Sequence, residues 1–129
     1  MTAQAQVKAE LQAGVAQTFE VLAWEIELAG ARCIHLDKLI GEILPDMPNP
    51  HREQLLESLH TVDLLAQHLT NLSAFARHMG ESAPADMSVT VQGAIGDITL
   101  GALADRMFTA LGGEEPEEND HEAGDLDLF

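Results

Sequence analysis

Cysteine, tyrosine and aromatic side chains are scarce in this sequence of 129 residues. Cys33 is the only cysteine, so no disulfide can form within the chain. Aromatic residues make up only 4% of the sequence, whereas hydrophobic residues make up 46%, and tyrosine is absent. The hydrophobic core must therefore be built from Leu, Ile, Val and Ala, as in helix bundles.

Basic residues are also few, with 6 Lys and Arg against 22 Asp and Glu and a formal net charge of −16. Eight of the 22 acidic residues lie in 114–129, which contains no Lys or Arg, so the rest of the chain carries 14 acidic and 6 basic residues. Phosphate backbones and anionic membranes would repel both parts, so we expect neither nucleic-acid nor membrane binding.

Long hydrophobic runs are missing as well, and no segment approaches the roughly 18 consecutive apolar residues that a membrane-spanning helix needs. The N-terminal segment has neither the basic start nor the apolar run of a signal peptide. We expect a cytoplasmic protein.

Apolar residues recur every three or four positions between residues 15 and 43, an average spacing of about 3.5 residues. This is the repeat of a helix that packs lengthwise against other helices, and we expect it to start between Ala3 and Val7 and to end near Leu44. A similar stripe follows the prolines at 45–50. The two stripes consist of Val15, Phe19, Leu22, Ile26, Ala29, Cys33, Leu36, Ile40 and Ile43, and of Leu55, Leu59, Val62, Ala66, Leu69 and Ala76.

Pro45 ends the first helix, because proline cannot continue the hydrogen-bond ladder. Asn49 is suited to cap the second helix, Pro50 to occupy its first turn, and Gly80 to end it after about Met79. The connection is short, so the sequence predicts an antiparallel helical hairpin over residues 1–80. A hairpin alone would leave one side of each stripe exposed. A homodimer forming a four-helix bundle would cover that side, and a third helix that folds back is the alternative.

Residues 81–113 combine helix-breaking residues with short apolar stretches. The alternation of Val89 and Val91 permits a short strand, with a small hairpin across Gln92-Gly93 as one arrangement. Thr99 resembles the cap of a short amphipathic helix that ends at Gly112-Gly113. Residues 114–129 have the composition of a disordered acidic tail. The fold class is therefore all-α, with a hairpin, a short third helix and a tail.

A line of polar residues follows the second helix. If Leu59 and Val62 face inward, Asp63 and Gln67 lie one above the other at the margin of the core, because residues four apart stack on one helix face. His60 and Asn71 extend this line in both directions. A solvated helix face without any further role is the alternative.

Asp63 and Gln67 resemble the active-site signature of the CheZ family of chemotaxis phosphatases, an Asp-x-x-x-Gln on a long helix of a dimeric four-helix bundle. The resemblance implies a phosphatase that removes the aspartyl-phosphate of a response-regulator receiver domain. Gln67 would orient the attacking water, and Asp63 would pair with a lysine of the receiver. The receiver supplies Mg²⁺, so the chain needs no cofactor of its own.

The acidic tail ends in three large apolar residues, Leu126, Leu128 and Phe129. Exposed Leu and Phe gain nothing in water, so an apolar end on an acidic tether has the form of a docking peptide. Phosphatases of the CheZ type are similar here, with an acidic linker and an Asp-Leu-rich end that captures the regulator. The sequence DLDLF also resembles the peptide by which bacterial proteins bind the sliding clamp, which would make the chain a non-enzymatic adaptor. A tail that packs on its own bundle or adds solubility is the third alternative.

The six histidines do not form a recognised metal-binding motif, and His60 and His68 lie about 12 Å apart along a helix, too far to share one ion. We therefore expect no metal site. His60 on a bundle face would suit a histidine phosphotransfer or dimerisation module, which is the remaining functional alternative. Cys33 lies on the apolar stripe and is interpreted as a small core residue.

Overall fold

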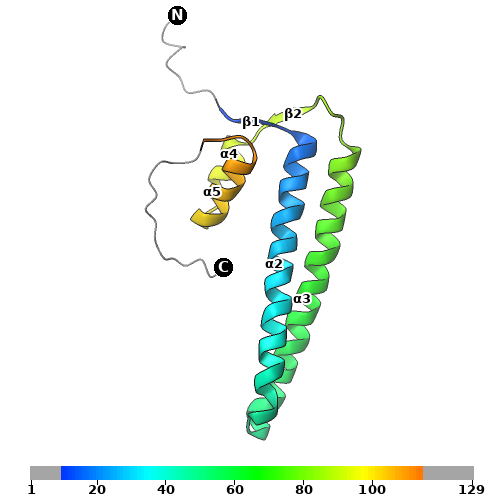
Figure 1. The fold of residues 1–129 in the computed structure, drawn as a ribbon, viewed down its shortest axis with the longest axis vertical. Coiled ribbons are helices and arrows are strands. Elements are labelled where there is room, and N and C mark those ends of the chain that lie inside the picture. Colours follow the sequence, from blue (N-terminus) through cyan, green and yellow to red (C-terminus); the bar gives the residue numbers. More distant parts are fainter. Residues whose placement is uncertain (1–9, 115–129) are drawn as a thin grey trace, which may run out of the picture. The chain divides into compact units, whose positions relative to one another are not determined.

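A computed structural model describes residues 10–114, and its described part divides into two compact units (Figure 1). The first unit is Leu22–Ser82, and the second combines the segments that precede and follow it. The predicted tail, with Leu126, Leu128 and Phe129, lies outside the described residues, except for Glu114.

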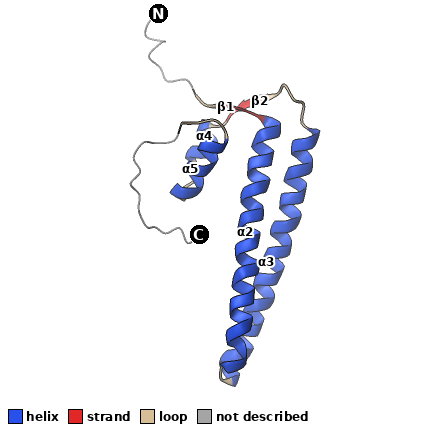
Figure 2. Ribbon diagram, in the orientation of Figure 1, coloured by secondary structure: helices blue, strands red, loops and turns tan. Residues whose placement is uncertain are grey.

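The first unit is most of the predicted antiparallel hairpin of two long helices, whose first seven residues, 15–21, belong to the second unit (Figure 2). Helix α2 spans Val15–Ile43 over 29 residues, and α3 spans Asn49–Ser82 over 34 residues. The 3-10 turn η1, Leu44–Asp46, follows α2 directly, with Pro45 inside it. The Arg52 N–H donates to the Pro48 carbonyl at 2.8 Å, which closes the first turn of α3. Helix α3 continues through Gly80, where the sequence predicted a stop, and ends two residues later.

The contact line between the two helices differs from the predicted one on α2. Leu22, Ala29, Leu36 and Ile43 are exposed in the hairpin, so these members of the predicted stripe do not pack against α3. From residue 23 onward, Glu25, Leu28 and Arg77 are half-buried at other positions of the two helices, and the remaining buried or half-buried residues follow alternating steps of three and four. They are Ala23, Ile26, Gly30, Cys33, Asp37 and Ile40 on α2, and Leu55, Leu59, Val62, Ala66, Leu69, Ser73, Ala76 and Gly80 on α3; we call this line the seam.

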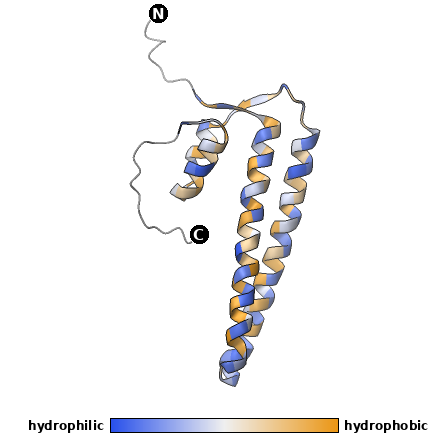
Figure 3. Cartoon of the chain, in the orientation of Figure 1, coloured by the Kyte–Doolittle hydropathy of each residue, from blue (hydrophilic) through white to orange (hydrophobic). Residues whose placement is uncertain are grey.

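Small side chains explain the shift of the seam. Ala23 is fully buried, and Ala76 and Ser73 are 3% and 4% exposed. At Gly30 an added Cβ would lie 3.5 Å from the Leu69 Cβ, so the two helices approach closely there. Small residues let two helix backbones come together, whereas the prediction from apolar periodicity favoured the larger neighbouring residues. Hydrophobic residues therefore also remain on the outside of the hairpin, where they alternate with hydrophilic ones (Figure 3).

The second unit begins with a strand where the sequence predicted helix. Strand β1, Gln12–Gly14, pairs antiparallel with β2, Ser88–Thr90, and Ala13 lies opposite Val89. Two flanking backbone bonds of 2.9 Å, from Val15 N–H to Met87 O and from Val91 N–H to Leu11 O, extend the pairing. The expected start of the first helix near residues 3–7 is therefore wrong, because the backbone bonds of 12–14 go to a segment distant in sequence.

A small core holds the second unit together. Ala13, Val91 and Leu111 are buried, and Leu11, Val21 and Ile95 pack against them. The Gln92 side-chain oxygen accepts a bond of 2.8 Å from the Leu11 N–H.

Gln92 and Gly93 open helix α4, Gln92–Gly96, so the hairpin considered across Gln92-Gly93 does not form. The predicted amphipathic helix is α5, Gly101–Ala110. Leu100 rather than Thr99 occupies its cap position, without a side-chain bond. None of the helices within residues 10–114 is long and apolar enough to cross a bilayer.

Gly41→Ala is expected to stabilise the protein. Gly41 is exposed within α2, and an added Cβ would meet nothing within 4 Å. Alanine favours helix over glycine by about 1 kcal/mol, so the free energy of unfolding should rise by about that amount. Urea denaturation followed by circular dichroism measures the change, and a loss of stability would contradict the helix assigned here.

Gly112→Ala is expected to have the opposite effect. Gly112 follows α5 with φ of 103°, the left-handed region, and an added Cβ again meets nothing within 4 Å. Neither substitution causes a steric clash, but alanine at Gly112 is strained by the left-handed backbone. The same denaturation experiment should therefore show that the free energy of unfolding falls by about 1 kcal/mol. An unchanged or higher stability would contradict the turn at Gly112.

Candidate functional site

The side chains predicted to act on a receiver domain lie in the middle of α3. Asp63 and Gln67 are both exposed and are one helical turn apart, about 6 Å along the axis. Helical geometry at residues 63–67 and solvent access to both side chains are the two conditions that the sequence interpretation required. The structure meets both conditions.

The seam determines where these side chains point. Leu59, Val62, Ala66 and Leu69 of α3 are buried or half-buried against α2, so Asp63 follows directly after one seam residue and Gln67 after another. In heptad terms Asp63 is at position e and Gln67 at position b, which lie on the same flank of the helix. The packing of Val62 and Ala66 against α2 therefore fixes the position of the pair along the hairpin axis.

An ion pair identifies this flank on the hairpin as a whole. Arg77 Nη2 lies 2.6 Å from Glu27 Oε2, and both residues are at position e of their helices. In an antiparallel pair of helices, e positions face e positions across one flank and g positions face g positions across the other. Asp63 therefore lies on the flank that carries the ion pair, which we call the polar side and define by Glu27, Asp63, Thr70 and Arg77.

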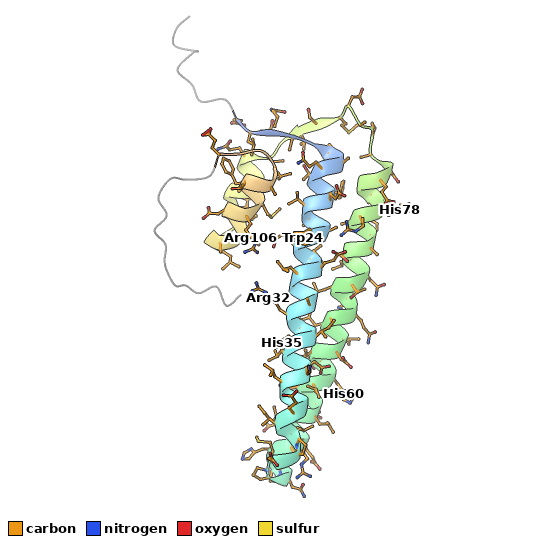
Figure 4. All side chains as sticks on the ribbon, in the orientation of Figure 1. Trp24, Arg32, His35, His60, His78 and Arg106 are labelled. Carbon is orange, nitrogen blue, oxygen red and sulfur yellow. The ribbon has the colours of Figure 1, made fainter. Side chains whose placement is uncertain are left out.

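Neither the Asp63 carboxylate nor the Gln67 carboxamide has a hydrogen-bond partner among residues 10–114. Asn71, the expected extension of the polar line, instead donates its Nδ2 to the main-chain oxygen of Gln67 at 2.9 Å. Its amide is therefore held on its own helix. His60 is exposed on α3, one turn before Asp63 (Figure 4).

This arrangement is suited to recognition and positioning. A carboxylate accepts hydrogen bonds from an ammonium group, and a carboxamide both donates and accepts, so it can hold a water molecule in a fixed orientation. Two such groups on a helix flank present no cavity walls of their own. Both groups are therefore accessible only from the solvent side of the helix.

No group of three His, Cys, Asp or Glu side chains within the described part of the chain is arranged to hold a metal ion. His60 and His78 of α3 are separated by about five helical turns (Figure 4). Cys33 is half-buried in the seam, as its place on the apolar stripe predicted.

The sequence predicted that one side of the hairpin is exposed, but it did not identify which residues form that side or the ion pair on the opposite flank. Glu27 and Arg77 are 50 residues apart in the sequence, so their ion pair can be predicted only when the alignment of the two helices is known. The sequence did contain one signal. An inward-facing row through Ala23 and Gly30 has the same helical spacing as the predicted row through Leu22 and Ala29, and it places Leu22, Leu36 and Ile43 outside the seam.

A family model described as "Domain of unknown function (DUF8776)" matches residues 12–129, almost the whole chain. The chain belongs to the DUF8776 family. A search of the curated proteins and a search of the solved structures each found no match. The match to DUF8776 begins at β1 and includes both units as well as the C-terminal residues Leu126, Leu128 and Phe129.

Asp63→Asn and Gln67→Ala are expected to leave the free energy of unfolding within about 0.5 kcal/mol of the wild type, as for exposed positions without specific contacts. Neither side chain has a bond to lose, because both are exposed and without partners among the described residues. Thermal denaturation of both variants tests this. A loss above about 2 kcal/mol would mean that the pair is structural, since such values indicate a specific contact.

Proposed function

We propose that this protein is a CheZ-like phosphatase that acts on the aspartyl-phosphate of a response-regulator receiver domain. The observation that supports the proposal is the exposure of Asp63 and Gln67, one turn apart and without competing partners among the described residues. The resemblance of their spacing to the CheZ signature supplies the reaction.

In the proposed reaction, the receiver brings the phosphoryl group, the Mg²⁺ and a lysine. The carboxamide of Gln67 holds a water molecule in line with the bond to be broken, and Asp63 accepts a hydrogen bond from the lysine ammonium. The water oxygen forms a bond to phosphorus, the aspartyl oxygen leaves as a carboxylate, and inorganic phosphate is released. The contribution of this chain is placement, which accounts for much of catalysis when a reaction is limited by positioning.

A neutral amide is better suited than a carboxylate to the water-holding position. It binds water through both its oxygen and its nitrogen, without adding negative charge beside a phosphoryl group. Asp63, by contrast, needs a negative charge to attract the lysine. The two neighbouring residues thus have different chemistry because they contact different parts of the receiver.

The proposal includes a homodimer in which two hairpins form a four-helix bundle. It also includes capture of the receiver by the apolar end of the acidic tail, Leu126, Leu128 and Phe129, an idea that rests on the sequence alone. A tether of this kind raises the local concentration of the partner to about the millimolar range.

Phosphate release from a purified receiver tests the enzymatic proposal. A CheY-type receiver from the same genome is phosphorylated with a small-molecule phosphodonor and Mg²⁺, and its decay is followed with and without the protein. Wild type should accelerate decay, and Gln67→Ala should lower the accelerated rate by about 100-fold, because the attacking water loses its fixed position.

Gln54→Ala is the matched control, because Gln54 is an exposed amide on the same helix, away from Asp63. The Gln54→Ala variant should accelerate decay as the wild type does. A variant that lacks residues 124–129 should reach the same decay rate only at a higher protein concentration, because it lacks the proposed docking end. Equal decay with wild type and Gln67→Ala, across all receivers of that genome, would eliminate the enzymatic proposal. Capture of the sliding clamp that is lost with residues 124–129 would favour the adaptor. Acid-labile phosphate on His60 would favour the phosphotransfer module.

A further inference from the structure

Most of the large apolar side chains that the hairpin exposes lie along one flank, while Trp24, Ile34, Leu56 and Leu64 are exposed at other heptad positions. Leu22, Leu36 and Ile43 of α2 are 39%, 47% and 53% exposed, and each is at position g of its heptad. Leu65, Leu72 and Met79 are at position g of α3, with exposed fractions of 45%, 53% and 37%. The neighbouring c positions add Leu39 and Phe75, which are 43% and 63% exposed. We call these eight residues the apolar side.

The antiparallel register places both rows together. Position g faces position g across one flank of an antiparallel pair, as e faces e on the flank where Glu27 meets Arg77. The close approach of Gly30 and Leu69 sets the register of the two helices, that is, which residues of α2 and α3 lie at the same level. Leu36 and Leu65 are thus neighbours near the middle of the flank. The apolar side lies opposite the polar side that contains Asp63.

Charge is distributed unequally between the two flanks. Among the g and c positions of the described hairpin, Glu25 is the single acidic residue, in a chain with 22 acids. The remaining acidic residues of both helices are at positions other than g and c, among them Glu27, Glu57 and Asp63. A surface that meets its own copy must avoid like charges, because a strongly acidic protein repels itself elsewhere. The apolar side meets this requirement.

The exposed area is sufficient for a stable contact. The exposed fractions of the eight residues correspond to about 700 Å² per protomer, close to the roughly 800 Å² per partner of a stable interface. Monomeric soluble proteins seldom leave an apolar patch of that size uncovered. Aliphatic side chains in heptad register are the surface that forms the core of a four-helix bundle.

We propose that the apolar side is the surface on which a second copy of this chain docks, so that two hairpins share one four-helix core. Both polar sides then face outward, and each Asp63–Gln67 pair stays open to a partner. This inference specifies the interface of the proposed homodimer and does not depend on the phosphatase activity.

Leu65 and Leu56 allow a matched test in the full-length chain. Both are leucines of α3 with the same exposed fraction of 45%, but Leu65 is on the apolar side and Leu56 is at an e position on the opposite flank. Sedimentation equilibrium should give about twice 13.9 kDa for the wild type. Leu65→Glu should weaken dimerisation by about 100-fold or more, since two-fold symmetry buries the new charge twice. Leu56→Glu should remain dimeric.

Circular dichroism of both variants shows whether the helices persist. If Leu65→Glu does not fold, the thermal midpoint of the wild type still decides, because the midpoint of a dimer rises with protein concentration and that of a monomer does not. A wild type that is monomeric at about 100 μM, well above the dissociation constant of a typical stable dimer, would overturn the proposal. Equal dimer dissociation constants for Leu65→Glu and Leu56→Glu would also overturn it. Loss of dimerisation with Leu56→Glu alone would also overturn it.

Discussion

Close packing between α2 and α3 determines which residues of the hairpin are available for function. Ala23, Gly30, Ser73 and Ala76 allow the two backbones to approach, and each is buried. Because a helix has a fixed angular repeat, burying one row of residues turns every other row to a defined direction. The small residues of the seam therefore determine the positions of Asp63 on one flank and of Leu65 on the other.

The two flanks differ in chemistry, and this difference connects the proposed activity with the proposed assembly. The polar side has an ion pair and an open Asp63–Gln67 pair, while the apolar side has eight exposed hydrophobic residues and little negative charge. A hairpin that dimerises through the apolar side has a rigid core, which a positioning mechanism requires. An assembly through the opposite flank would cover Asp63, which the proposed reaction requires to be accessible.

The second unit depends on contacts that are distant in sequence. Gln12–Gly14 form a strand only because Ser88–Thr90 supply the backbone partners, and the core of Ala13, Val91 and Leu111 joins both ends of the described chain. Local periodicity predicted helix through residues 12–14, since nothing in the segment itself indicates a strand. Helix α5, by contrast, ends at Ala110, just before the predicted stop at Gly112-Gly113, because Gly112 tolerates the left-handed backbone that follows the helix.

The sequence by itself determined the two long helices, the proline-rich turn between them, and the helical spacing of Asp63 and Gln67. These features follow from local rules: a repeat near 3.5 residues, a missing N–H in proline, and stacking of residues four apart. Only the tertiary structure decided that Ala23 and Gly30, rather than Leu22 and Ala29, face α3, and that residues 12–14 pair with 88–90. Both outcomes depend on which backbone segments approach each other, and such contacts are made by residues that are far apart in the sequence.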